Sequence, residues 1–344
     1  MKFKIKLFIG FLFLCISAGF FISCNQKTLN QGHVHTKFML GVHSRITVLG
    51  ASAEKSKYIA DTIFAEWDRI SKDFSFSEPY SYVSDVNKYA YIKPVKINEE
   101  LYELLRQSVN YYNLTDGAFD ITFAPLWPIW KEAAALKKLP ADEDIKKAVA
   151  NIGLNNVEVN PYDKTVKFNK PVHINVGGIL RAHCLKRGYK ILKEIGGDYS
   201  VELKLGGYVL AHGNHNWEYP VYDPFKSESV IGKICFRDGV VVSSSGRDHF
   251  VKIEGKLYSH ILDLKTGYPL KDFSNLIVYF PSIDDESFIP SAVLSLMGKN
   301  KTFEVLSAAK ESMGVWIDGR GQIYTLENKE SQARWYKSKK FLFF

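Results

Sequence analysis

The sequence has only four cysteines among its 344 residues, and two of these lie within the first 24 positions. The other two, Cys184 and Cys235, belong to no CxxC pair and to no spacing typical of a metal site. The chain is therefore neither a disulfide-rich scaffold nor a zinc-ribbon protein. Cys184 and Cys235 either form one disulfide or remain as buried free thiols.

Long apolar runs and clusters of one charge are also scarce. Beyond the first 23 residues no stretch of about 20 apolar residues occurs, so we expect no further membrane-spanning helix. The formal net charge is +8, but lysine and arginine are spread along the chain. Because nucleic-acid-binding proteins usually gather basic residues on one surface, we expect no nucleic-acid partner.

The N-terminus has the composition of an export signal. Three lysines within the first six residues precede an apolar run at 7–21 that is short for a membrane span. The run leads into Ser23-Cys24, which resembles the lipobox of bacterial lipoproteins. This resemblance implies a signal peptide at 1–23, lipidation at Cys24 and a tether at 24–36. The protein would then be lipid-anchored to a membrane of the cell envelope, facing the periplasm. The alternative is an ordinary cleaved signal peptide with an incidental cysteine.

The remaining chain is 46% apolar and has a 14% share of aromatic residues, enough for one large domain or two packed lobes. Apolar residues at helical spacing predict helices at 58–70, 101–112, 142–152, 180–195, 290–296 and 302–309. Alternating or β-branched runs predict strands at 45–49, 156–159, 165–169, 199–204, 208–212, 230–236, 240–243, 250–253, 275–280, 314–317 and 322–326. Most helices precede most strands, and hairpin-length gaps separate many strands. This order favours an α+β fold with mainly antiparallel or mixed sheets.

Four segments are richer in glycine, serine and threonine than folding requires: 115–122, 175–179, 205–207 and 243–246. A glycine pair ahead of a helix, as at Gly177-Gly178, lets backbone N–H groups approach an anion at the positive end of the helix dipole. A single glycine pair is more often a tight turn.

Two charged residues accompany these segments. Arg181, one turn into the helix, could grip a pyrophosphate with its planar guanidinium or be a solvated helix charge. His260 begins the segment 260–269 and could be a general base or a hydrogen-bonded strand histidine.

Taken together and in this order, the segments resemble the ApbE family of flavin transferases. The resemblance runs from Phe38 to Leu326 and implies a domain at 37–330 with a C-terminal tail at 331–344. Its most specific matches are 117–122 with Pro125, Leu126 and Trp130, and 260–263 with 266–269. Supporting matches are Ser81, Ser84, Asn87, Gly177-Gly178-Ile179, Gly206-Gly207 and Ser245-Gly246.

The resemblance implies a two-lobed α+β protein that binds FAD in a cleft between the lobes, with Mg²⁺ on the pyrophosphate. The implied activity joins the FMN half of FAD, by a phosphoester, to a threonine or serine of an exported acceptor protein. Implied catalytic residues are Arg181 and His260, the latter as the base or as the group that orients the acceptor. Asp263 and Thr266 would shape the turn around the phosphates. The full set of implied FAD contacts is Gly117, Ala118, Phe119, Asp120, Gly177, Gly178, Gly206, Gly207, Ser245, Gly246, Asp263, Thr266 and Gly267.

The metal site departs from the family pattern, which puts an Asp and a Thr four residues apart on one helix. Counted back from Gly298, these positions are Phe288 and Ala292, and neither side chain can coordinate Mg²⁺. We expect both to project from one helix face toward the pyrophosphate. A shift in register would instead offer Asp284, Asp285 or Glu286 together with Ser291.

Other positions also differ from the family pattern, namely Leu40, Val42, Ser77, Asn175, Lys186, Lys204 and Tyr208. Lys186, Lys204 or Arg247 could supply a fixed positive charge in place of a metal. Three functions follow from these observations. The favoured one is an FAD:protein FMN transferase. The others are a catalytically inactive flavin- or nucleotide-binding lipoprotein and an FAD pyrophosphate hydrolase.

Overall fold

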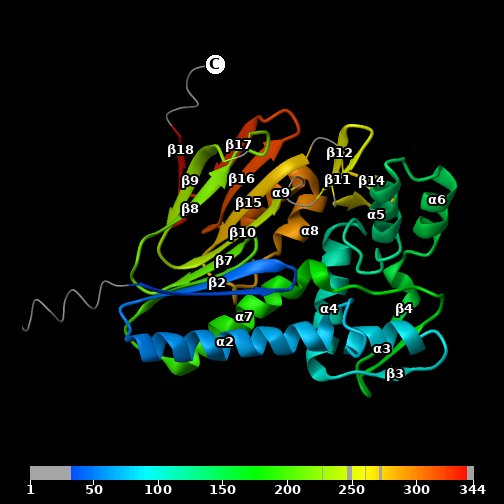
Figure 1. Ribbon diagram of the computed structural model, residues 1–344, viewed down its shortest axis with the longest axis horizontal. Coiled ribbons are helices and arrows are strands. Elements are labelled where there is room, and N and C mark those ends of the chain that lie inside the picture. The colour runs from blue at the N-terminus through cyan, green and yellow to red at the C-terminus, as the bar shows by residue number, and fades with distance from the viewer. Residues whose placement is uncertain (1–31, 227, 246–249, 260, 271–272, 339–344) are drawn as a thin grey trace, which may run out of the picture.

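The computed structural model describes residues 32–226, 228–245, 250–259, 261–270 and 273–338. Its centre is an eight-stranded antiparallel sheet with the order β1-β2-β6-β7-β10-β15-β16-β17 (Figure 1). These strands are β1 (His33–Met39), β2 (Val42–Leu49), β6 (Ser200–Leu205), β7 (Tyr208–His212), β10 (Gly239–Ser245), β15 (Phe273–Phe280), β16 (Met313–Asp318) and β17 (Ile323–Glu327).

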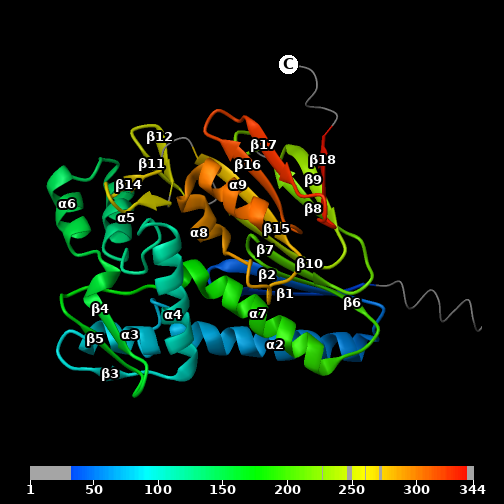
Figure 2. The same ribbon diagram turned by 180° about the vertical axis from the view of Figure 1, so that it is seen from behind.

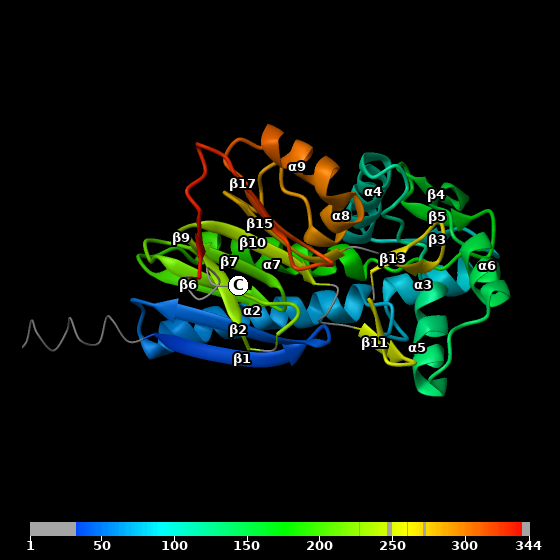
Figure 3. The same cartoon turned by 90° about the horizontal axis from the view of Figure 1, so that it is seen from above.

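Both faces of this sheet are covered, as the view from above shows (Figure 3). One face packs against the helices α2 (Ala53–Phe74), α7 (Gly177–Ile195), α8 (Ser291–Leu296) and α9 (Gly298–Ala308). The other face packs against a three-stranded sheet of β8 (Trp217–Tyr222), β9 (Val230–Phe236) and β18 (Arg334–Lys337). Alternate residues of β10 therefore enter different cores: Val240 and Val242 face the helices, and Val241 faces the small sheet.

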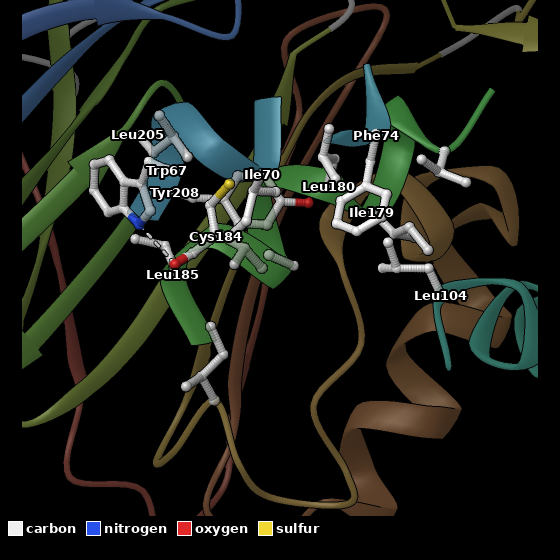
Figure 4. Close-up of a cluster of buried hydrophobic side chains, with 14 of the residues drawn as sticks. Trp67, Ile70, Phe74, Leu104, Ile179, Leu180, Cys184, Leu185, Leu205 and Tyr208 are labelled. Carbon is white, nitrogen blue, oxygen red and sulfur yellow. Dashed lines mark hydrogen bonds between the residues drawn. The ribbon is translucent and has the colours of Figure 1, made fainter. Parts of the chain in front are cut away.

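Helix α2 shows how the helical layer forms. Ser52 caps its N-terminus by accepting a hydrogen bond from the backbone N–H of Lys55. The predicted apolar stripe is buried, and at its centre the Trp67 indole N–H donates to the Cys184 carbonyl oxygen of α7 at 2.7 Å (Figure 4). The two helices can approach closely at Gly188, where a Cβ would lie 3.2 Å from the Trp67 indole nitrogen.

A second group of elements lies at one end of the main sheet, on the right in Figure 1 and on the left from behind in Figure 2. The group consists of α3 (Tyr82–Tyr89), α4 (Glu99–Leu114), α5 (Leu126–Leu136), α6 (Asp142–Ala150), the 3-10 helix η1 (Leu154–Asn156), the sheet β3 (Val95–Lys96), β5 (Thr165–Phe168) and β4 (Val157–Asn160), and the hairpins β11 (Phe250–Ile253)–β12 (Lys256–Ser259) and β13 (Leu262–Asp263)–β14 (Tyr268–Pro269). Within this group, the helices α5 and α6 and the strands β11 and β13 form a small hydrophobic core, which includes Trp130 and Leu262.

The predicted α+β class with antiparallel sheets is confirmed, and each predicted helix and strand overlaps an observed one. Several elements were not predicted, including α3, α5, β1, β8 and β18. Two predicted boundaries differ from the structure. The tether at 24–36 overlaps β1, which begins at His33, and the tail at 331–344 contains β18, which pairs with β9.

Cys184 and Cys235 do not form a disulfide with each other. Cys184 is buried in the helical layer, Cys235 is half-buried on β9, and each is a free cysteine. In the part of the chain that the structure describes, no helix combines the length and apolarity needed to cross a membrane.

Candidate functional site

A cavity of about 640 Å³ lies where the main sheet, the start of α7 and the second group of elements meet. One wall is polar and is formed by the start of α7, the β6–β7 turn and the end of β10, with Gly177, Gly178, Gly207 and Ser245 among its residues. The remaining lining is largely apolar. It includes Phe119, Phe123, Trp127, Ile261, Leu262 and Leu264.

The start of α7 is held by the segment before it. The Asn175 backbone N–H donates to the Ile121 carbonyl oxygen at 2.6 Å, and the Asn175 side-chain oxygen accepts from the Gly177 N–H at 2.9 Å. The ring of Phe119 lies against Gly178, because a Cβ there would be 3.2 Å from the ring. The helix start therefore meets the aromatic wall at a position that only glycine fits without displacement.

Two cations line the described part of the cavity. Arg181 projects from the first turns of α7, and Lys131 lies on α5 with its Nζ 5.7 Å from the centre of the Trp127 ring. Among the described residues, neither cation forms an ion pair with a carboxylate. Among the described lining residues, Asp120 is the only acid. The cavity is therefore suited to an anionic ligand that carries a flat apolar group.

Asp120 was predicted as an FAD contact, but its carboxylate binds the protein. One oxygen accepts from the Thr122 backbone N–H at 2.8 Å and hydroxyl at 2.7 Å. The other oxygen accepts from the Leu154 N–H at 2.9 Å. The side chain is 5% exposed, so these bonds join the 115–122 loop to η1. Asp120 thus positions the loop that carries Phe119.

Gly117 and Ala118, unlike Asp120, are not among the residues that line the cavity. Gly117 has a φ of +79°, and a Cβ there would lie 3.3 Å from the ring of Tyr112. The Ala118 N–H donates to the Thr115 carbonyl oxygen at 3.1 Å. Both residues shape the turn that follows α4, and Phe119 is the member of the motif that reaches the cavity.

The β6–β7 turn approaches β10 closely. Gly206 has a φ of +60°, and a Cβ on Gly207 would lie 2.6 Å from the Ser243 Oγ. Next to this turn, the Ser244 hydroxyl donates to Ser291 Oγ at 3.0 Å, and Ser291 donates to the Tyr208 hydroxyl oxygen at 3.3 Å. Burial raises the pKa of Tyr208, so its phenol stays neutral at physiological pH.

Of the predicted residues, Asp263 ends β13, and Thr266 and Gly267 lie in the β13–β14 turn. None of the three is among the cavity-lining residues. The Asp263 carboxylate accepts from the Lys265 N–H at 2.9 Å and from the Thr266 hydroxyl at 3.1 Å. The Gly267 carbonyl oxygen accepts from the Trp130 indole N–H at 2.9 Å. The turn docks on α5 in this way, while the neighbouring side chains Leu262 and Leu264 reach the cavity wall. His260, Gly246 and Cys24 lie outside the described residues.

The expected arrangement of Phe288 and Ala292 on one helix face is wrong. Pro290 immediately precedes α8, so Phe288 lies before the helix, and its ring packs edge-on against Phe280 at 5.3 Å. Only Ala292 lines the cavity. The described cavity wall contains none of the alternative metal ligands Asp284, Asp285, Glu286 and Ser291. Asp284 instead binds Lys193 at 2.6 Å.

These contacts decide how well the described residues suit Mg²⁺, which prefers carboxylate oxygens and water. The described lining residues offer one carboxylate, Asp120, and both its oxygens are already bound by N–H and O–H donors. No group of three or more His, Cys, Asp or Glu within the described ranges is arranged to hold a metal ion. The described part of the cavity therefore does not fit the metal that the family resemblance implies.

Sequence reasoning missed Phe123 and Lys131. Lys131 lies on α5, whose apolar residues are interrupted by Pro128 and preceded by Pro125. Proline is tolerated in the first helical turn because the N–H groups there have no partner within the helix. The signal that could have revealed this helix was therefore a proline pair at its start.

The sequence is similar to a known protein family and to known enzymes. A model of the ApbE family matches residues 40–317. The chain is 30% identical to the FAD:protein FMN transferase of Chlamydia pneumoniae over 256 residues, covering 72% of this chain and 77% of that protein. It is 21% identical to the Escherichia coli K12 enzyme of the same name over 326 residues, covering 88% and 90% of the two chains.

Solved structures of ApbE proteins have the same fold. The ApbE protein from Thermotoga maritima superposes with a TM-score of 0.76 at 26% identity, covering 87% of this chain and 97% of that one. The flavin transferase ApbE from Vibrio cholerae has the same fold, with a TM-score of 0.70 at 19% identity and coverage of 87% and 98%. The chain belongs to the ApbE family.

Proposed function

We propose that this protein is an FAD:protein FMN transferase that moves FMN from FAD to a serine or threonine of an exported acceptor protein. The observation that carries the proposal is the cavity itself, which is lined both by Arg181 near the start of α7 and by aromatic and aliphatic side chains. An arginine beside a helix N-terminus suits the diphosphate of FAD, and the apolar wall suits its flat ring. Family membership supports the same ligand.

The reaction is a displacement at phosphorus. The acceptor hydroxyl loses its proton to a base, and its oxygen forms a bond to the phosphorus of the FMN half. The anhydride P–O bond breaks, and AMP leaves with the electron pair. Arg181 would stabilise negative charge on the phosphoryl oxygens. We propose His260 as the base on the strength of the sequence motif 260–269.

The proposal is tested by incubating the full-length protein with FAD and a candidate acceptor. We expect fluorescent flavin bound covalently to the acceptor, with release of one AMP per flavin. An acceptor whose target Ser or Thr is replaced by valine is the control and should stay unlabelled. The His260→Asn variant should bind FAD but lose labelling by about 10²-fold or more.

Two other outcomes would contradict the transferase proposal. Release of both FMN and AMP without an acceptor would identify an FAD pyrophosphate hydrolase. Bound FAD that gives neither product with any acceptor would identify a binding protein, the reading that the apolar positions Phe288 and Ala292 favour.

We also propose that the protein is anchored by a lipid on Cys24 and works in the cell envelope, facing the periplasm. Support comes from the basic, apolar and small residues that precede Cys24 in that order. The acceptor would then be another exported protein.

A further inference from the structure

The family resemblance implies Mg²⁺ on the pyrophosphate, whereas the described cavity lacks the oxygen ligands for it. We propose that this site binds the diphosphate of FAD without a divalent metal ion, and that Arg181 and Lys131 supply the positive charge. The inference rests on the proposed function in one respect, namely that FAD is the ligand.

The first step concerns the side of the cavity formed by α8. The described residues that line it there are Ala292, Ser295 and Leu296. None carries a charge, and the Ser295 hydroxyl donates to the Ala292 carbonyl oxygen at 3.2 Å. Phe288 lies before the helix, against Phe280. A carboxylate is therefore missing from this part of the described wall.

The second step concerns the space beside Ala292, where polar atoms are already bonded to each other. Ser244, Ser291 and Tyr208 form a chain of hydroxyl groups with contacts of 3.0 Å and 3.3 Å. Ser291 and Tyr208 are buried, and burial raises the Tyr208 pKa, which keeps its phenol protonated. Neutral hydroxyls that bond to one another are poor ligands for a hard dication compared with carboxylates. This chain occupies the wall beside α8 with uncharged groups.

The third step concerns where positive charge is present. Arg181 and Lys131 approach the cavity from different elements, α7 and α5, and within the described ranges neither has a carboxylate partner. A diphosphate diester carries two negative charges, so two fixed cations balance it. The Arg181 guanidinium can bind phosphate oxygens in a bidentate manner, and Lys131 acts as a point charge. The predicted substitutes Lys186 and Lys204 do not line the cavity, and Lys186 lies 3.8 Å from Asp284. Arg247 lies outside the described residues.

The metal is tested by calorimetric titration of the full-length protein with FAD, in excess Mg²⁺ and in EDTA. We expect the two dissociation constants to agree within about twofold. A dissociation constant at least tenfold higher in EDTA would overturn the proposal, since it would show that a divalent metal contributes to binding.

The charges are tested with Lys131→Ala and Arg181→Ala, each titrated with FAD and with riboflavin in EDTA. We expect each variant to bind FAD at least tenfold more weakly and riboflavin, which has no phosphate, as the wild type does. Lys138→Ala, beyond the end of α5, and Lys190→Ala, on the exposed side of α7, are matched controls that should bind FAD normally. Wild-type FAD affinity in both cavity variants would refute the assignment.

Two further results separate this inference from the proposed function. Arg181→Lys keeps the charge, so it should retain more FAD affinity than Arg181→Ala if both variants fold alike by circular dichroism. If the wild type binds ADP but not FAD in EDTA, and both alanine variants lose ADP, the charge assignment stands and the transferase proposal fails. If it binds neither, the diphosphate site itself is refuted.

Discussion

Substitution of Asp120 tests whether its carboxylate stabilises the loop at 115–122 or binds the ligand. Asp120 is a cavity-lining residue, yet its carboxylate accepts hydrogen bonds from the Thr122 N–H, the Thr122 hydroxyl and the Leu154 N–H. Asp120→Asn preserves the shape of the side chain, removes its charge and replaces one acceptor oxygen with an NH₂ donor. We expect the variant to lose stability while keeping most of its affinity for FAD.

The size of the effect follows from the three bonds. With the amide oxygen turned toward Thr122, the NH₂ group faces the Leu154 N–H and leaves a buried donor unpaired, at a cost of about 1–3 kcal/mol. The two bonds to Thr122 lose their charge assistance, about 1 kcal/mol each. Relief of the buried charge offsets part of this. The net loss should be about 2–4 kcal/mol.

The assay is urea unfolding followed by tryptophan fluorescence. With a slope of about 3 kcal/mol/M, the midpoint should fall by about 1 M. Thr122→Ser keeps the hydroxyl that bonds Asp120 and removes one methyl group, so its loss should be about 1 kcal/mol. An unchanged midpoint for Asp120→Asn, together with at least tenfold weaker FAD binding, would show that the carboxylate contacts the ligand instead.

Three further outcomes are expected. Gly207→Ala should lower the unfolding midpoint and weaken FAD binding, because its Cβ would lie 2.9 Å from the Ser243 carbonyl oxygen, which cannot move without disturbing β10. A hydrogen bond from Arg69 holds the pKa of Glu66 at about 2, below its ordinary value of 4.5. This stabilisation is present above pH 4.5 and is lost as the pH falls toward 2, so Glu66→Gln should flatten that part of a melting-temperature profile. Burial raises the pKa of the Cys184 thiol, so a thiol reagent should modify it only after unfolding.

The fold was predictable wherever burial leaves a regular pattern. The apolar stripe on α2 predicted the helix. The first turn of α2 was not predicted, because the capping residue Ser52 adds no apolar residue to the stripe. The strand β1 was read as a tether because an edge strand exposes most of its side chains, and β1 buries only Met39. The strand β8 contains Pro220, and a proline within a sequence segment argues against a strand. Proline is nevertheless tolerated at the sheet edge that β8 occupies.

The site was predictable from its glycines but not from its charges. Gly177, Gly178 and Gly207, which were predicted to contact FAD, all line the cavity, where other groups approach the backbone closely. The role of Asp120 depends on Leu154, which is 34 residues away in the sequence. Lys131 joins Arg181 only because α5 folds against the hairpins that follow β10. Such pairings arise from tertiary contacts, and no local pattern encodes them.

His33 and the cavity lie at opposite ends of the β1–β2 hairpin. Strand β1 begins at His33 and runs antiparallel to β2, and Val42 at the start of β2 lines the cavity. At about 3.3 Å per residue, the six steps from His33 to Met39, which pairs with Val42, separate His33 from the cavity by about 20 Å. A lipid on Cys24 would join the chain before His33, and the described chain enters the fold at the hairpin end that lies away from the cavity.

This arrangement predicts that lipidation and FAD binding are separable. Cys24→Ala should abolish incorporation of labelled palmitate and move the protein from the detergent phase to the aqueous phase. FAD affinity should stay within about twofold of the wild type, because the change lies beyond the far end of β1. Cys15→Ala is the matched control, since Cys15 lies inside the apolar run of the leader and should not affect labelling. Palmitate label that persists in Cys24→Ala would refute the anchor, and a large loss of FAD affinity in that variant would refute the separation.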